Sequence, residues 1–172
     1  ERSFDERWID FPQNIGKSTG AFCSSPYGVH PYILISWTHK MREVFVLAHE
    51  LGHAGHFYLS QKNQNILNTR PSLYFIEAPS TMNELLMANH MKKNADDKRL
   101  KRWILSTMVS RTYYHNFVTH LLEAHFQREV YVAVDRNESI SANTLCDMFQ
   151  NTLEEFWGDA VEIKDGANLT WM

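Results

Sequence analysis

The chain has 172 residues and a net charge of −3 at pH 7, and 44% of its residues are hydrophobic and 13% aromatic. This composition supports one hydrophobic core and excludes a disordered segment, and the slight negative charge excludes a basic surface that binds nucleic acid. Apolar runs of only a few residues exclude a membrane span, and two cysteines make no disulfide framework, so we expect a cytoplasmic protein.

Residues 8–37 hold the strand-like part of the sequence. Two short runs, 21–24 and 32–37, are bounded by glycine, serine and proline, which favour turns at the ends of strands. Helical patterns dominate the rest of the chain, so the expected fold is mainly α with a small β-sheet.

The first of these runs is preceded by a glycine and contains mostly small residues. It could form an edge strand that binds an extended peptide by strand addition, with Gly20, Ala21 and Phe22 as the substrate-binding residues. A plain turn followed by a strand explains the same residues equally well. Both interpretations are open at this point.

Residues 41–60 contain no proline and include the sequence H-E-L-G-H at 49–53, which has the form H-E-x-x-H. With 9 His and 12 Glu in 172 residues, composition alone gives 172 × (9/172)² × (12/172), or about 0.03 such motifs. On a helix, His49 and His53 lie one turn apart on the same face, so both can bind one metal ion. Glu50 lies beside them, where it can accept a proton from water.

The residues around this motif predict a buried helix. Apolar side chains lie on nearly all of its sides, which predicts burial all round, and one stripe recurs with helical spacing at Val44, Ala48, Leu51, Gly55 and Tyr58. Buried imidazoles and a buried carboxylate need partners, which a metal ion would supply. Two glycines, at 52 and 55, indicate that another segment packs closely against the helix. The alternative is a buried helix with hydrogen-bonded histidines and no metal.

A zinc site of this kind needs a third protein ligand, and the following helix offers a candidate. Glu77 comes 24 residues after His53, which leaves room for the chain to turn back and present a carboxylate to the same metal. Glu84 follows seven residues later on the same helical face, where it could accept the other N–H of a ligand imidazole.

Other histidines are weaker candidates for the third ligand. His56 is too close to the motif along the helix to complete a tetrahedron, so we interpret it as a residue that supports the ligands without binding the metal, or as a polar core residue. His115, His120 and His125 follow one another in steps of five residues, which do not keep one face of an α-helix. We expect these three to be exposed or interhelical polar residues.

The remaining elements are mostly helical. Residues 61–70 form a polar loop, and a helix is expected over 71–93, with Pro79 at a kink or at the start of its main part. A long helix is expected over 97–134 from its apolar stripes, and Ser141 can cap a last helix. Residues 97–163 together form a helical scaffold in this interpretation.

The chain resembles the catalytic core of the thimet oligopeptidase and oligoendopeptidase F family of zinc metallopeptidases, and is most similar to the oligoendopeptidase F branch. Two segments that carry the resemblance are H-E-L-G-H-A-G-H at 49–56 and E-A-P-S-T-M-N-E at 77–84. The third consists of residues 16–22, followed by His-Pro-Tyr-Ile-Leu at 30–34. The match covers most of residues 8–90, and its spacing is specific.

This resemblance implies one Zn²⁺ per chain, bound by His49, His53 and Glu77, in a partial zincin-like core of the gluzincin type. It implies Glu50 as the general base in hydrolysis of short peptides. Family members carry a later His- and Tyr-rich segment that stabilises the oxyanion, and this segment is expected after Met172. We therefore expect residues 1–172 to be a catalytic-domain fragment whose partner is the remainder of its own polypeptide.

Two rival classes use the same residues differently. A di-iron carboxylate protein also uses E-x-x-H, here Glu50 to His53, but it needs a second such motif, and the sequence has none. A non-enzymatic helical module could hold a structural zinc, which is usually closed by four ligands and does not require a glutamate beside them.

Overall fold

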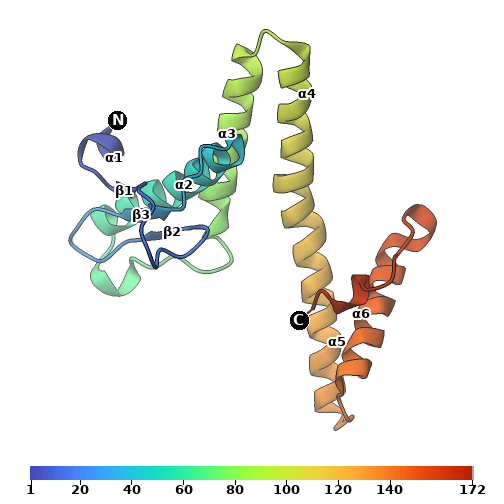
Figure 1. Cartoon of the computed structure of the whole chain (residues 1–172). Helices are drawn as coiled ribbons and strands as arrows, with labels where there is room; N and C mark the ends of the chain where they lie inside the picture. The colour runs from blue at the N-terminus through green and yellow to red at the C-terminus, as the bar shows by residue number, and fades with distance from the viewer. Residues whose placement is uncertain (172) are drawn as a thin grey trace. The chain divides into compact units, whose positions relative to one another are not determined.

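The computed structural model describes residues 1–171, and the chain forms two compact units that divide after Met108. The first unit has a small sheet and long helices, and the second is helical (Figure 1). The predicted class, mainly α with a small β-sheet, is confirmed. The first unit contains, in chain order, α1 (Arg2–Asp5), β1 (Ile9–Asp10), β2 (Ala21–Ser24), β3 (Tyr32–Ile35), α2 (Met41–Asn63), a 3-10 turn (Ile66–Asn68), α3 (Glu77–Asn94) and α4 (Lys98–Thr107).

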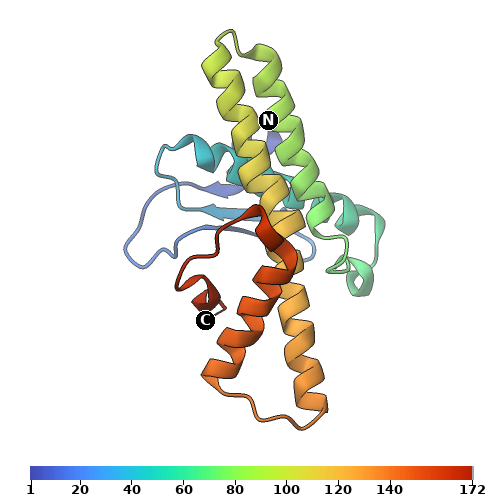
Figure 2. The ribbon, with the colours of Figure 1, turned by 90° about the vertical axis from the view of Figure 1, so that its right-hand side faces the viewer.

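The sheet has the strand order β1-β3-β2, and its strands lie side by side in both views of the ribbon (Figures 1 and 2). β1 is parallel to β3, whereas β2 is antiparallel and pairs Ala21 with Ile35 and Ser24 with Tyr32. β2 therefore lies at an edge. The second predicted run ends at Ile35 rather than Trp37, and the two-residue β1 was missed because so short a strand has no period.

A buried lysine fixes the connection between β1 and β2. The Lys17 ammonium donates hydrogen bonds to the carbonyl oxygens of Asp10 (2.9 Å) and Pro12 (2.8 Å), and it lies 3.4 Å from the Asp10 carboxylate. Its side chain is only 3% exposed. A buried ammonium requires such partners, so the loop that leads into β2 has a defined course.

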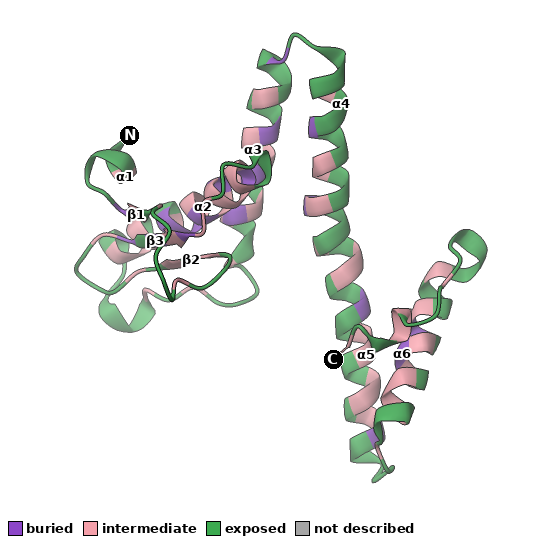
Figure 3. Cartoon of the chain, in the orientation of Figure 1, coloured by how far each residue is buried: buried purple, intermediate pink, exposed green. Residues whose placement is uncertain are grey.

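Helix α2 contacts the sheet on one side and α3 on another. Its buried residues are Phe45, Ala48, Glu50, His53 and Ala54. The prediction that α2 is buried on nearly all sides was wrong, because the side chain of Leu59 is 60% exposed and Gly55 is also exposed. The packed elements cover only part of the helix surface, as the mixture of buried and exposed residues along α2 in Figure 3 indicates.

Helix α3 begins at Glu77, six residues later than predicted. Pro79 is in its first turn, where the missing backbone N–H leaves no helical hydrogen bond unmade. The preceding residues form turns, in which the N–H groups of Phe75 and Ile76 donate to the carbonyl oxygen of Ser72. The core of this unit contains Phe45, Ala88, Ala95 and Ile104, with Met91 and Met108 packed against it.

In the second unit, α5 (His120–Asp135) and α6 (Ala142–Trp157) lie side by side (Figure 2). Ser141 caps α6 and accepts a hydrogen bond from the N–H of Thr144, as predicted. Short 3-10 turns follow at Gly158–Ala160 and Ala167–Leu169.

The helix predicted over 97–134 is not a uniform α-helix. Two π-helical segments, Met108–Tyr113 and His115–Thr119, interrupt it between α4 and α5. A π-turn has an i→i+5 repeat, so the five-residue step from His115 to His120 brings their rings together, with centroids 4.2 Å apart. The prediction that His115 and His120 do not share a helical face assumed an α-helix, and that assumption was wrong for this pair.

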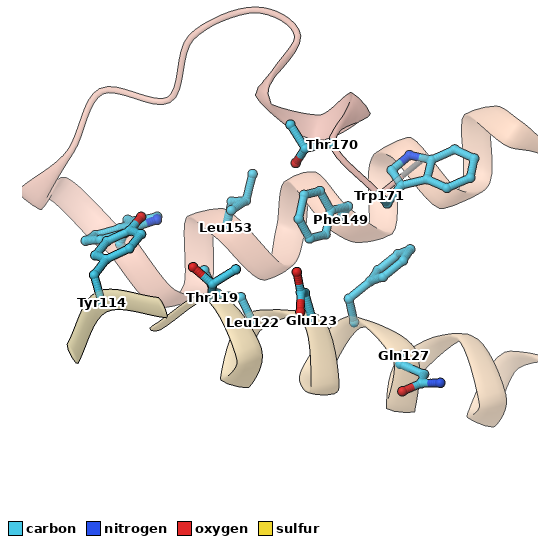
Figure 4. Close-up of a pocket in the computed structure, with 11 residues that line it drawn as sticks. Tyr114, Thr119, Leu122, Glu123, Gln127, Phe149, Leu153, Thr170 and Trp171 are labelled. Carbon is cyan, nitrogen blue, oxygen red and sulfur yellow. The ribbon is translucent and has the colours of Figure 1, made fainter. Parts of the chain in front are cut away.

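A cavity of about 490 Å³ lies within the second unit (Figure 4). Phe149 and Leu153 of α6 face Leu122 of α5 across it, and Trp171 approaches from the C-terminal segment. Glu123 is the one ionised side chain that lines it. Among residues 1–171, no helix combines the length and the hydrophobicity that a membrane crossing requires.

Candidate metal centre

Helix α2 presents His49 and His53 from the same face, one turn apart. Their ring centroids are 4.8 Å apart and the ring planes meet at 84°. The His53 side chain is nearly buried, whereas that of His49 is 25% exposed, so the pair is open to solvent on one side. Two imidazoles in this arrangement can bind one metal ion and leave access for a further ligand.

Glu77, the first residue of α3, brings a carboxylate to this pair. Its Oε2 atom lies 3.1 Å from Nε2 of His49 and 3.4 Å from Nε2 of His53. Donors bound tetrahedrally to zinc at about 2.0–2.1 Å are about 3.3 Å apart, so these separations fit a shared ion. The three side chains are the only cluster of this kind among residues 1–171, with ligand atoms all within 4.8 Å of one another.

A glycine allows α3 to approach α2 this closely. A Cβ atom on Gly52 would lie 2.6 Å from the carbonyl oxygen of Pro79 and 2.6 Å from Cα of Ser80. Any side chain at position 52 would therefore displace the first turn of α3, which carries Glu77. Gly55, also expected to mark close packing, has nothing within 4 Å of such a Cβ.

Ser80 holds the carboxylate of Glu77. Its hydroxyl lies 2.8 Å from Oε2 of Glu77 and 2.9 Å from the carbonyl oxygen of the same residue. Ser80 is fully buried, so water does not compete directly for this hydroxyl. Ser80 was not predicted from the sequence, although a serine three residues after Glu77, one turn along a helix, was a usable signal.

Two further contacts join the helices around the site. The Nδ1–H of His49 donates to Oε1 of Glu84, 2.7 Å away, and Glu84 is buried. Because a carboxylate can only accept, this bond leaves the Nε2 lone pair of His49 free to face a metal. One residue before Glu84, the Asn83 amide donates to the carbonyl oxygen of Ala48 at 2.5 Å.

The environment shifts the pKa of each histidine differently. Burial alone would lower the pKa of His49, but the Glu84 hydrogen bond and the neighbouring carboxylates outweigh it and raise this pKa. Burial lowers the pKa of His53, which the charge of Glu77 offsets only in part. A neutral His53 at neutral pH is the form that binds a metal.

Glu50 lies in the same group and is only 7% exposed. Burial raises the pKa of its carboxyl group, and the negative charges of Glu77 and Glu84 raise it further, against an opposing effect of His49. A carboxylate with a raised pKa is a stronger base, which is the property required of a residue that accepts a proton from water.

His56 does not join the ligand cluster. Its ring stacks on that of Phe57, with centroids 6.0 Å apart, and Phe57 in turn stacks on His53 at 5.8 Å. Its Nδ1 atom is buried and has no hydrogen-bond partner among residues 1–171.

The other predicted residues lie at the sheet edge. Phe22 is exposed on β2, and Ala21 pairs with β3. Gly20 precedes the strand with a φ of 94°, which only glycine adopts easily, and its carbonyl oxygen accepts from the N–H of Ser36. Cys23, on the same strand, is close enough to Glu50 for that charge to add to burial, and the pKa of the thiol rises to about 12.

Comparison with known proteins gives a consistent result. The model of peptidase family M3 matches residues 1–171. The chain is 28% identical over 171 residues to oligopeptidase PepF of Bacillus subtilis, and 30% identical over 165 residues to an oligoendopeptidase F homolog of Borreliella burgdorferi. These alignments cover 99% and 95% of this chain but 25% and 28% of the relatives, so the chain spans about a quarter of their length.

Solved structures agree on the fold. A crystal structure of a Chlamydophila abortus protein superposes with a TM-score of 0.80 at 29% identity. The match covers 99% of this chain and 29% of that protein's chain. A Bacillus anthracis structure superposes with a TM-score of 0.74 at 20% identity, over 92% of this chain and 28% of that one.

Proposed function

Because the chain belongs to peptidase family M3, we propose that it carries the metal ligands and the general base of a zinc-dependent endopeptidase that hydrolyses oligopeptides. The observation that carries the proposal is the convergence of His49, His53 and Glu77 beside the buried Glu50. The names of the relatives, oligopeptidase and oligoendopeptidase, support short peptides as the substrate class.

In this proposal, His49, His53 and Glu77 hold one zinc ion, and Glu84 orients His49 through its Nδ1–H. When bound, zinc would supply Lewis-acid chemistry, which acidifies water and polarises a peptide carbonyl. Glu50 would accept the proton of the attacking water and then donate it to the leaving amine. Its raised pKa suits a group that must both accept and release a proton.

The edge strand β2 is proposed to align the substrate. Extended peptides bind to free strand edges through backbone hydrogen bonds, and β2 has only β3 as a partner in the sheet described over residues 1–171. Gly20, Ala21 and Phe22 would be the contact residues. With the ligand helices α2 and α3, this strand would make a zincin-like core of the glutamate-ligand type.

We place the proposed activity in the cytoplasm. Its two cysteines, Cys23 and Cys146, are both unpaired, which agrees with a reducing compartment.

The proposal is tested with the intact protein, its metal content and a set of quenched-fluorescent peptides. Elemental analysis should give one zinc per chain, and a chelator should abolish cleavage that added zinc restores. Two irons per chain would instead favour a di-iron carboxylate protein. One zinc without cleavage of any peptide would favour a structural zinc module.

A further inference from the structure

A second feature of the first unit is a polar cavity beside the candidate metal centre. Its volume is about 430 Å³. Residues 23–26, which are the end of β2 and the two residues after it, form one wall. Phe57 and Gln61 of α2 form another, and Arg70 and Ile76 of the segment before α3 complete the lining.

The cavity is adjacent to the residues proposed to bind zinc. Phe57 follows His53 by one helical turn, about 6 Å along the axis, and the two rings are stacked with centroids 5.8 Å apart. On the other side, Ile76 is directly before Glu77. An extended peptide advances about 3.3 Å per residue, so a residue one or two positions from the scissile bond would reach this cavity.

Most polar groups of the wall already have partners. The Gln61 amide donates to Oγ of Ser25 at 2.5 Å and to the carbonyl oxygen of Pro26 at 3.0 Å, and its oxygen accepts from the N–H of Gly28 at 3.1 Å. Gln61 therefore ties the segment after β2 to α2 and keeps the cavity wall in place. It has no donor left for a ligand.

Arg70 is different, because it is an exposed residue whose guanidinium has no hydrogen bond or ion pair among residues 1–171. It is the only ionised side chain that lines the cavity, and neither aspartate nor glutamate lines it. A guanidinium offers several N–H donors in a planar arrangement that matches a carboxylate. The cavity therefore has an unpaired positive charge next to the proposed reaction centre.

We propose that this cavity is a substrate subsite that binds a carboxylate of the peptide, with Arg70 as the residue that determines this specificity. The inference rests on the proposed peptidase function and names the kind of peptide that the site prefers. The carboxylate can belong to an acidic side chain or to the C-terminus of the peptide.

The direction of β2 distinguishes these two sources. A peptide that pairs antiparallel with β2, as β3 does, has its N-terminal part at the Ser24 end, where the cavity lies. The cavity then receives an acidic side chain from before the scissile bond. A C-terminal carboxylate reaches the cavity only if the peptide pairs in the parallel direction.

The test uses the intact protein and quenched-fluorescent peptides that are identical except for one group. In one arm, Glu replaces Gln at each of two positions on either side of the scissile bond. In the other arm, a free C-terminal acid replaces the amide. The wild-type protein should cleave one acidic peptide with kcat/KM about tenfold higher than its neutral partner, as expected for a charge-assisted hydrogen bond.

Variants of Arg70 identify the group responsible. Arg70→Gln should abolish the preference, so that acidic and neutral peptides are cleaved with kcat/KM values within about twofold of each other, and Arg70→Lys should retain part of the preference. Lys92→Gln, an exposed cation in the last turn of α3, is the matched control and should keep the full preference. Equal zinc content and melting temperature in all variants would exclude a folding defect.

Two outcomes would overturn the inference while leaving the peptidase intact: cleavage by the wild-type protein without any preference for a carboxylate, or an unchanged preference in Arg70→Gln. Failure to cleave any peptide would overturn the proposed function itself, and the subsite with it.

Discussion

Gly52 and Ser80 bring the two helices of the candidate metal centre into contact. A Cβ atom at position 52 would lie only 2.6 Å from Cα of Ser80, which is backbone and cannot yield as a flexible side chain does. Ser80 in turn hydrogen-bonds the Glu77 carboxylate at 2.8 Å. A missing side chain on α2 therefore sets the position of a carboxylate on α3.

The first prediction concerns this contact. Gly52→Ala should push the first turn of α3 away from α2, with a loss of about 1–3 kcal/mol in the free energy of unfolding of the metal-free protein. Zinc affinity should fall as well, because Glu77 moves with α3. Thermal unfolding and competition with a chromogenic zinc chelator measure the two effects.

Gly55→Ala is the matched control, on the same helix. Its new methyl group meets nothing within 4 Å, and alanine has a higher helix propensity than glycine, so this variant should be stabilised by up to about 1 kcal/mol. Equal effects of the two substitutions would contradict the close-contact explanation.

The second prediction concerns the hydroxyl that holds Glu77. Ser80→Ala should leave the fold in place, since it removes one oxygen from a buried position, but it frees the carboxylate to leave its position near His49 and His53. Loss of a contact that orients a ligand typically weakens metal binding by about 10- to 100-fold. Zinc competition titration of the folded variant measures this, and wild-type affinity would show that Ser80 has no such role.

The third prediction separates binding from proton transfer. Glu50→Gln should keep stoichiometric zinc, because Glu50 is not in the ligand cluster, yet it should lower kcat by about 10²- to 10⁴-fold or more. His49→Ala should instead lose the zinc. A Glu50→Gln variant with wild-type kcat would exclude Glu50 as the general base.

The fourth prediction follows from the raised pKa of Glu50 in the metal-free protein. The folded chain binds this proton more tightly than the unfolded chain, so the carboxyl costs stability as the pH rises through the unfolded pKa towards the folded value. Glu50→Gln removes this loss of stability, because the glutamine side chain does not ionise. The variant should have a melting temperature close to that of the wild type at about pH 4 and a higher one at pH 7. A difference that shrinks as the pH rises would contradict the sign.

The fifth prediction concerns Cys23, whose thiol has a pKa of about 12. At pH 8 only about one thiol in 10⁴ would be ionised, so alkylation of Cys23 in the folded protein should be at least about 100-fold slower than in urea. Peptide mapping after timed exposure to iodoacetamide measures the rate at this residue. Equally fast labelling with and without urea would show an accessible, ionisable thiol.

The local elements follow from the sequence because neighbouring residues alone specify them. His49 and His53 share a helical face at a separation of four residues, and this holds in any α-helix. Ser141 caps α6 for an equally local reason, since its side chain bonds the N–H three residues later.

Other features depend on segments that are distant in sequence, and the sequence alone did not determine them. The position of the first turn of α3 decides which of the two glycines in α2 is closely packed. Gly52 contacts that turn, whereas Gly55 is exposed. The strand β1 exists because Ile9 pairs with Ile33, and two residues have no pattern of their own. The cavity beside Arg70 likewise needs β2, α2 and the segment before α3 together.

The sequence by itself therefore determined that His49, Glu50 and His53 of the H-E-x-x-H motif, the proposed ligands and base, lie together, because their geometry is that of one helical turn. Only the tertiary structure decided that Glu77 lies 3.1 Å from His49 and that Ser80 holds it there. The physical reason is that a contact between two helices depends on the side chains of both, and on the space that one missing Cβ leaves between them.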